Sequence, residues 1–308
     1  MTRRFLLHPF FANRAAFAAA SLVFCLFATP PIVRAADVLI IKDADNQIVR
    51  DAILGFKTAC GCRTTEFDLS DLDAIEKALR EHPDAIFTVG SKALARAAVI
   101  KHIPLIYALV APADEPPLSS ANISGVSMNI SPHTYFDAML KLFPKARRIG
   151  VIYDPANNGS YLSEAQPDAV SHQIQLVTRE IDSGMAAFKA LDGLRGKVDL
   201  IWMLPDQTVV NSNFVDALML FSFTHKYPVF SFAQKFVDRG AAAALFARPA
   251  ELGSQAGEVA QTILKGGRGP IRMYAEHTRL LVNPKVMENM KAPGSPEPRS
   301  RPEGVNYP

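Results

Sequence analysis

The sequence predicts an α/β protein of two Rossmann-like lobes, each a parallel sheet flanked by helices. After residue 35, short apolar runs alternate with amphipathic stretches, a pattern typical of parallel strands joined by crossover helices. One sequence pattern also occurs twice. Asp84–Ser91 and Asp199–Asp206 each begin with an acidic residue, continue with an apolar run and end in polar residues. Each is followed by a helical stretch and a second apolar run behind a proline, at Ile103–Tyr107 and Tyr227–Ser231.

Residues 1–35 have the pattern of a cleaved signal peptide. Three arginines precede an apolar run over residues 15–28, and Val33-Arg34-Ala35 fits cleavage near Ala35. The run is short for a membrane span, so a retained membrane anchor is the weaker alternative. We therefore expect export to the periplasm.

The charge of the chain argues against nucleic acid as a partner. Of its 33 lysines and arginines, four lie in the first 35 residues, which contain no acid, so the remainder has 29 basic residues against 30 acidic ones. These basic residues are scattered, whereas nucleic-acid surfaces need clusters. Cys60-Gly61-Cys62 favours a structural turn or local disulfide, with redox or metal chemistry as the alternative.

The first lobe is expected to contain four strands and three helices before residue 128. Apolar residues at helical spacing predict the helix around residues 48–56, and the helix that begins at Asp71 stops before Pro83. In chain order these are strand Val38–Ile41, a helix that buries Ile48, Val49, Ala52, Ile53 and Phe56, helix Asp71–Glu81, strand Ile86–Val89, helix Ser91–Ile100, and strands Leu105–Val110 and Ile123–Ser127.

The order of elements then restarts. Ser131 followed by Pro132 is a strong helix start, and the strand Ile149–Tyr153 comes next. Glu251–Leu264 is a predicted helix in which Gly253 and Gly257 indicate close packing. Residues 271–282 are predicted to be extended, and residues 292–308 to form a disordered tail because they are rich in proline and charge.

Polar residues at strand ends are the candidate binding groups. Gly90, Ser91 and Lys92 follow a strand, so their amides could bind an anion, although a helix cap explains them equally. Asp206, with Gln207 and Thr208, could neutralise an ammonium group, and here a helix cap is again the alternative.

Further candidates lie in a third strand-end loop and in nearby rings. The loop carries Asn157, Asn158 and Ser160, which an Asx-rich turn would also explain. The rings gather where strands end and could wall a ligand or simply fill the core, the favoured interpretation for Phe230. They are Tyr107, Tyr153, Phe230 and Phe232.

Catalytic, cofactor and metal signatures are missing from the sequence. There is no nucleophile elbow, phosphate-binding loop or dinucleotide fingerprint. The six histidines after residue 35 show no metal-ligand spacing. We therefore expect no catalytic residue, no cofactor and no metal, and an exported hydrolase is a remote alternative.

Several stretches together resemble the periplasmic substrate-binding proteins of ABC transporters. The branch is the type I two-lobed group with tryptophan- and tyrosine-binding members, and the resemblance extends from about Asp37 to Met290. It is carried by Pro83–Ser91, Asn122–Ser127, Arg148–Pro155, Lys197–Val209, and Leu252–Ala256 with Ile263–Gly267.

The resemblance implies a monomer that captures a small polar, amino-acid-like ligand between its lobes and delivers it to an ABC permease of the inner membrane. It adds Asp45 and Asn46 to the candidate contacts, and the loop 111–117 departs from the family pattern. A three-stranded hinge is implied, with lobes at 36–127 plus 234–268 and 128–233 plus 269–291. The alternative function is an extracytoplasmic sensor that signals to a membrane partner.

Overall fold

The computed structural model describes residues 35–117, 119–267, 269–290 and 306–307. The expected signal peptide lies outside the described residues apart from Ala35, and so does the expected tail apart from residues 306–307. The described residues from Ala36 onward belong to one unit. No helix among the described residues is long and apolar enough to cross a membrane.

The first sheet is entirely parallel, with strand order β11-β5-β4-β3-β1-β2. Apolar side chains of α1 and α9 pack on one face and those of α2 and α3 on the other. The elements are β1 (Asp37–Lys42), α1 (Gln47–Cys60), β2 (Arg63–Asp68), α2 (Leu72–Arg80), β3 (Ala85–Val89), α3 (Ser91–Ala97), β4 (Leu105–Ala108), β5 (Ile123–Val126), α9 (Pro249–Leu264) and β11 (Arg272–Met273).

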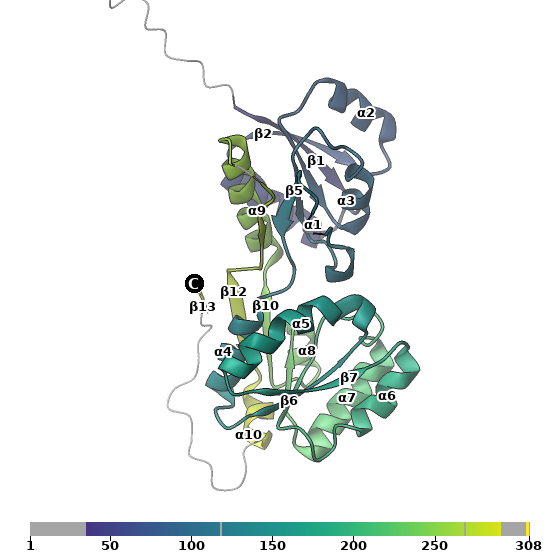
Figure 1. Cartoon of the computed structure of the whole chain (residues 1–308), viewed down its shortest axis with the longest axis vertical. Coiled ribbons are helices and arrows are strands. Elements are labelled where there is room, and N and C mark those ends of the chain that lie inside the picture. Colours follow the sequence, from purple (N-terminus) through teal and green to yellow (C-terminus); the bar gives the residue numbers. More distant parts are fainter. Residues whose placement is uncertain (1–34, 118, 268, 291–305, 308) are drawn as a thin grey trace, which may run out of the picture. The chain divides into compact units, whose positions relative to one another are not determined.

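The second sheet has the order β13-β12-β10-β9-β8-β6-β7, and only its β12 and β13 run antiparallel to their neighbours. Helices α4 and α5 cover one face, and α6 and α7 the other (Figure 1). The elements are α4 (Pro132–Leu142), β6 (Arg148–Tyr153), α5 (Pro155–Ser171), β7 (Gln175–Glu180), α6 (Gly184–Asp192), β8 (Leu200–Trp202), α7 (Ser212–His225), β9 (Val229–Ser231), α8 (Gln234–Asp238), β10 (Ala243–Ala247), β12 (Thr278–Val282), α10 (Pro284–Met290) and β13 (Asn306–Tyr307).

The predicted α/β class and the repeated unit are confirmed. In the first sheet β3, α3 and β4 form a strand-helix-strand unit with parallel strands, and β8, α7 and β9 do the same in the second. The predicted start of α4 also holds, because the Ser131 side chain accepts a hydrogen bond from the Thr134 amide. Two details differ: Ile48, expected on the buried face, is 57% exposed, and β2 is a fifth strand before residue 128, where four were expected.

Helices α1 and α9 approach each other as closely as their backbones allow. A Cβ atom on Gly253 would lie 1.9 Å from the carbonyl oxygen of Ala52, and one on Gly257 would lie 2.7 Å from that of Phe56. Glycine at both positions therefore permits the contact, as the sequence predicted. The packing aligns Phe56 on α1 with Phe87 on β3, whose stacked rings are 3.9 Å apart.

The chain passes between the sheets at different places from those expected. The segment Ala243–Ala247 was expected in the first lobe, but as β10 it pairs with β9 and β12 of the second sheet. The alanine-rich run was not recognised as a strand because alanine has a low β propensity, which burial here overrides.

The last part of the chain is divided between the two sheets. The extended segment predicted over residues 271–282 consists of β11 in the first sheet and β12 in the second. The second crossing therefore follows Ala247 instead of lying near Gln234, and the third lies between Met273 and Thr278 instead of near Arg268. These pairings favour assigning residues 234–247 to the second lobe and 249–273 to the first.

Two local features complete the fold. Cys60 and Cys62 form a disulfide across a Cα separation of 5.2 Å, and Gly61 between them has a φ of 61°, so the local bridge is confirmed. Asn306–Tyr307, which was expected in the disordered tail, pairs with β12 as β13.

Candidate functional site

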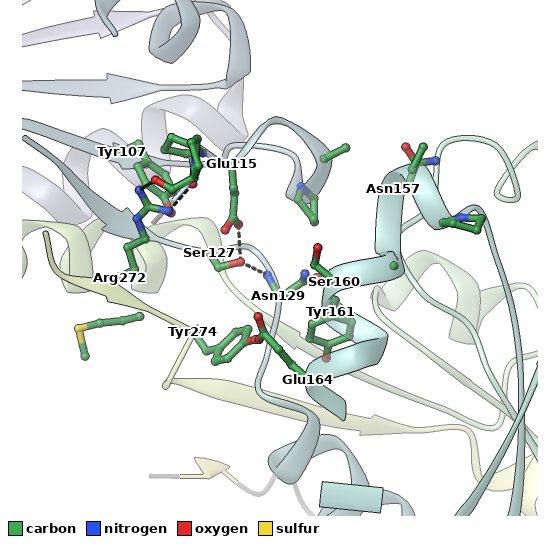
Figure 2. A pocket seen from close by; sticks show the side chains of 18 residues that line it. Tyr107, Glu115, Ser127, Asn129, Asn157, Ser160, Tyr161, Glu164, Arg272 and Tyr274 are labelled. Atoms are coloured by element: carbon green, nitrogen blue, oxygen red, sulfur yellow. Dashed lines mark hydrogen bonds between the residues drawn. The ribbon is translucent and has the colours of Figure 1, made fainter. Parts of the chain in front are cut away.

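A pocket of about 610 Å³ collects the polar and aromatic residues that best fit a binding site (Figure 2). Four segments line it: β4 with the loop that follows it, the residues after β5, the first turns of α5, and β11 with the residue that follows it. The volume lies within the usual range for small-molecule sites. The lining residues are Tyr107, Pro112, Ala113, Glu115, Pro116, Pro117, Ser127, Asn129, Pro155, Ala156, Asn157, Gly159, Ser160, Tyr161, Glu164, Arg272, Met273 and Tyr274.

Glu115 places a carboxylate inside this pocket. The hydroxyl of Ser127 donates a hydrogen bond to it, and the Ser127 oxygen in turn accepts one from the Asn129 amide at 3.0 Å. Burial raises the pKa of Glu115 above its ordinary value, although the Ser127 bond and the nearby Arg272 charge act in the opposite direction. The pocket therefore holds an acid whose ionised form lacks full solvation, which a cationic group would stabilise.

Arg272 fixes the loop that carries Glu115. It extends from β11, and its guanidinium donates to the carbonyl oxygens of Pro116 and Pro117. The unusual loop 111–117 is thus held over the pocket by a charge-assisted clamp.

Three tyrosines supply the aromatic walls. Tyr107 on β4 lies against β5, and a Cβ atom at Gly125 would fall 2.4 Å from its ring, so glycine is required there. Tyr161 on α5 donates a hydrogen bond of 2.6 Å to the Ile130 carbonyl, and its ring lies edge-on to Tyr274 at a centroid distance of 6.2 Å. The Tyr274 hydroxyl donates to Glu164, which adds a second carboxylate to the lining.

Asp206 serves the fold and leaves no free position for a ligand. Its carboxylate is only 2% exposed. One oxygen accepts from the Asn157 side chain at 2.9 Å and from two backbone amides at 3.0 and 3.2 Å, and the other accepts from the Asp154 amide and the Asn158 side chain at 2.8 and 2.9 Å. A carboxylate offers about four lone-pair positions, so five donors saturate it. The contact expected between Asp206 and a ligand ammonium is therefore corrected: this group locks the start of α5 to the loop after β8.

The predicted anion site at Gly90 and Ser91 is filled by the chain itself. The Asp43 carboxylate accepts a hydrogen bond from the Lys92 amide at 3.1 Å, and a Cβ atom on Gly90 would lie 2.2 Å from either Asp43 oxygen. Ser91 is also engaged, because its hydroxyl oxygen accepts from the Ala111 amide at 3.0 Å. Gly90, with φ of 102°, allows the chain's own acid to take the position expected for a ligand anion.

The first predicted loop is also occupied by local contacts. Asn46 caps α1 by accepting from the Val49 amide, and the Asp45 carboxylate pairs with Lys42 and Arg50. Both residues are exposed and neither lines the pocket.

The remaining predicted residues divide between two cavities. Tyr107, Asn157 and Ser160 line the large pocket, whereas Gln207 and Phe232 line a smaller one of about 230 Å³ that Asn157 and Asp206 also border.

Thr208 and Asn158 belong to the network around Asp206. Thr208 donates to the Asp154 carboxylate at 2.7 Å, and Asn158 is 1% exposed. Among the other rings, Phe230 is fully buried in the core, as its favoured interpretation predicted.

Sequence reasoning missed Glu115, Ser127 and Arg272. The loop 111–117 was recognised as unusual, and its single glutamate between prolines was the available signal. Ser127 directly follows a predicted strand, so the strand-end rule could have found it. Nothing local indicated Arg272, because its role depends on a strand that joins the first sheet only in the tertiary structure.

Known proteins resemble this chain in sequence and in structure. A profile of the family described as ABC transporter substrate binding protein matches residues 45–292. A tyrosine-binding protein of Clostridioides difficile (strain R20291) is 25% identical over 224 residues, which is 69% of this chain. The match covers 64% of that relative, so the chain spans slightly less than two thirds of its length.

Solved structures share the fold. The ligand-free, open structure of a substrate binding protein with adhesive properties from Clostridium difficile has a TM-score of 0.65 at 21% identity, covering 84% of this chain and 96% of that one. An ABC domain from Streptococcus pneumonia, in complex with L-Trp, has a TM-score of 0.55 at 18% identity, with coverage of 82% and 94%.

These similarities agree with the type I arrangement of two sheets described above. The family profile extends over most of the chain and includes every segment that lines the large pocket. The chain therefore belongs to the ABC transporter substrate binding protein family.

Proposed function

We propose that this protein is the periplasmic solute-binding component of an ABC transporter and that its ligand is a small molecule with an ammonium group, as in an amino acid. In this role it binds the ligand in the large pocket and delivers it to an inner-membrane permease, without catalysing a reaction. A signal peptide cleaved near Ala35 would export it.

The Glu115 carboxylate among the pocket tyrosines is the observation that carries this proposal. Three lining side chains are charged, namely Glu115, Glu164 and Arg272, and two of these are acids. Arg272 donates to the prolines of the loop through its two terminal nitrogens, and among the described residues its Nε has no hydrogen-bond partner, so the pocket offers charges of both signs, as an amino acid requires. An ammonium group beside Glu115 would replace the solvation that burial removes.

The neutral and aromatic groups suit the rest of such a ligand. Ser160 and Asn129 can donate hydrogen bonds to a ligand carboxylate, and the three tyrosine rings offer a surface for an apolar or aromatic side chain. Aromatic amino acids are the first candidates, because one relative is called a tyrosine-binding protein and one structure of the same fold contains L-Trp.

The test is a thermal-shift screen of the purified protein with the common L-amino acids, followed by calorimetry of each hit. We expect at least one amino acid to raise the unfolding temperature, and its analogue without the ammonium group to lose the effect. Glu115→Gln should weaken binding at least about tenfold, because a hydrogen bond to a charged group contributes about 1.5–3 kcal/mol.

The matched control is Glu258→Gln, an exposed residue on α9 away from the pocket, which should bind like the wild type. Undiminished affinity in Glu115→Gln, or no response to any amino acid, would contradict the proposal.

A further inference from the structure

A cluster of side chains that could bind a metal ion lies between α4 and α5. His133, Asp137 and His172 place one ligand atom each within 4.8 Å of one another, and Asp168 lies beside them. None of the four lines the large pocket. The histidines are 39 residues apart in the sequence, so their spacing gave no sign of this grouping.

The two helices bring these residues together by a simple pattern. His133 and Asp137 are four residues apart on α4, and Asp168 and His172 are four apart at the end of α5, so each pair lies on one helix face. Helices α4 and α5 pack against each other on the same side of the second sheet (Figure 1). The start of α4 is thus opposite the end of α5, with a histidine and a carboxylate from each.

The hydrogen bonds of His172 determine which ring nitrogen is free. Its Nδ1 is 2.6 Å from the backbone carbonyl oxygen of Asp168, which can only accept, so Nδ1 carries the proton. In the neutral ring Nε2 then has a lone pair, and this nitrogen lies 3.1 Å from an oxygen of the Asp137 carboxylate. Two acceptors that face each other at this distance need a cation, either a proton or a metal ion, between them.

A metal ion would satisfy the whole cluster, including the second histidine. Nε2 of His133 lies 3.5 Å from the other Asp137 oxygen, and the two imidazole rings are 4.8 Å apart. A single divalent ion can accept lone pairs from both imidazoles and from the Asp137 carboxylate, so it provides a common partner for all three side chains.

The distances fit the zinc class of ions. Zinc bonds to nitrogen and oxygen of about 2.0–2.1 Å place neighbouring ligand atoms of a tetrahedron about 3.3 Å apart. His172 Nε2 lies 3.1 Å from one Asp137 oxygen and His133 Nε2 lies 3.5 Å from the other, both near this value, and the three ligand atoms all lie within 4.8 Å of one another. Metal-binding histidines usually donate their other nitrogen to a carbonyl or carboxylate, and the Asp168 carbonyl does this for His172.

Asp168 also supports the second histidine. Its carboxylate lies 4.0 Å from His133 Nδ1, the nitrogen that would face away from the metal. Asp168 therefore bonds His172 through its backbone carbonyl and places a carboxylate near His133. Two imidazoles and one carboxylate favour zinc and its transition-metal neighbours over calcium or magnesium, which prefer oxygen ligands alone.

We propose that His133, Asp137 and His172 bind one divalent transition-metal ion of the zinc class, with water at the fourth position. Asp168 positions His172 through its backbone carbonyl without binding the ion. The side chains of His133 and Asp137 are 61% and 52% exposed, so the ion can enter from solvent. Once bound, it ties the first turn of α4 to the last turn of α5.

The experiment uses the protein purified without a histidine tag and treated with a chelator. Zn²⁺ is added in a calorimeter, the unfolding temperature is recorded with and without Zn²⁺, and Co²⁺ is used to detect the visible absorption of a low-coordinate site. We expect one Zn²⁺ per chain, a higher unfolding temperature, and a Co²⁺ band that Zn²⁺ removes.

The variants separate this site from other zinc ligands. His133→Gln, Asp137→Asn and His172→Gln should each weaken Zn²⁺ binding at least tenfold and remove the Co²⁺ band. The matched control His102→Gln changes an exposed histidine outside the cluster and should leave both unchanged.

Unfolding temperatures without metal show whether each variant folds. Failure of the wild type to bind Zn²⁺ at micromolar concentrations, or equal binding by folded variants and wild type, overturns the proposal. Loss of binding in the three cluster variants alone supports it.

Discussion

Replacing Asp206 tests most directly whether its carboxylate stabilises the fold or binds the ligand. In the structure it accepts five hydrogen bonds while only 2% exposed. Asp206→Ala removes all five at once and leaves two side-chain amides and three backbone amides without their acceptor. We expect this variant to be much less stable than the wild type even when no ligand is present.

The magnitude follows from the number and burial of those donors. Each buried donor left unsatisfied costs about 1–3 kcal/mol, but water can reach the donors of the half-buried residues, so the costs do not add fully. We expect a loss of about 3–5 kcal/mol in the free energy of unfolding. At about 2–4 °C per kcal/mol, the unfolding temperature should fall by roughly 10 °C. Asp206→Asn, which keeps one oxygen but turns an NH₂ group toward the donors, should lie between wild type and Asp206→Ala.

The chain contains its own probe for this measurement. Its single tryptophan, Trp202, is 1% exposed on β8, four residues before Asp206. Urea unfolding followed by Trp202 fluorescence therefore reports on the part of the fold that the carboxylate holds. Asp182→Ala, at an exposed loop position in the same lobe, is the matched control and should change the stability by less than about 0.5 kcal/mol. If Asp206→Ala unfolds within about 1 kcal/mol of the wild type but no longer binds ligand, the carboxylate serves the ligand and the reasoning fails.

Two other predictions concern the pocket acid and the packing of α1 on α9. Burial raises the pKa of Glu115 in the folded protein. The contribution of Glu115 to the stability of the ligand-free protein is therefore complete at pH values below its pKa in the unfolded chain. This contribution declines as the pH rises through the higher pKa of the folded protein. As the pH rises above the ordinary glutamate pKa of about 4.3, Glu115→Gln should flatten this decline in stability. Over the same range the affinity of the wild type for an ammonium ligand should rise. Unfolding and binding curves that match in the two proteins would contradict the assignment. Gly253→Ala should cost about 2–3 kcal/mol, because its Cβ would meet the Ala52 carbonyl oxygen at 1.9 Å, whereas an unhindered helical Gly→Ala change gains about 0.5–1 kcal/mol. Urea unfolding compares the free energy of unfolding of Gly253→Ala with that of the control Glu258→Ala, on the exposed face of α9. Equal stability of the two variants would show that α1 and α9 can separate without a loss of stability.

Most of the elements could be predicted because their signals are local. Ser131 caps α4 through an amide three residues away, and the apolar spacing of α1 depends only on the helical period. Gly253 and Gly257 indicated close packing because small residues on one helix face have few other uses. The α/β class follows from such local patterns, and it is the part of the fold that the structure confirms most fully.

The site was harder to predict because its residues meet across long distances in the chain. Asp43 is 47 residues from Gly90, yet its carboxylate fills the space in which a ligand anion was expected. A local pattern shows that an amide or a carboxylate is present but does not show which partner already occupies it. For the same reason the spacing of His133 and His172 suggested no metal site.

The α/β class, the repeated strand-helix-strand unit and the principal helix start could be read from the sequence, because all three depend on contacts between near neighbours or on periodicity. Long-range contacts set which sheet β10 and β11 join, which polar groups satisfy each other, and which remain facing the pocket. Asp206 was predicted as a binding residue and is saturated, whereas Glu115 lay in a loop that looked merely irregular and faces the pocket. Buried polar groups are mostly hydrogen-bonded within the protein, so a polar side chain can bind a ligand only where the fold leaves some of its donors or acceptors without a partner.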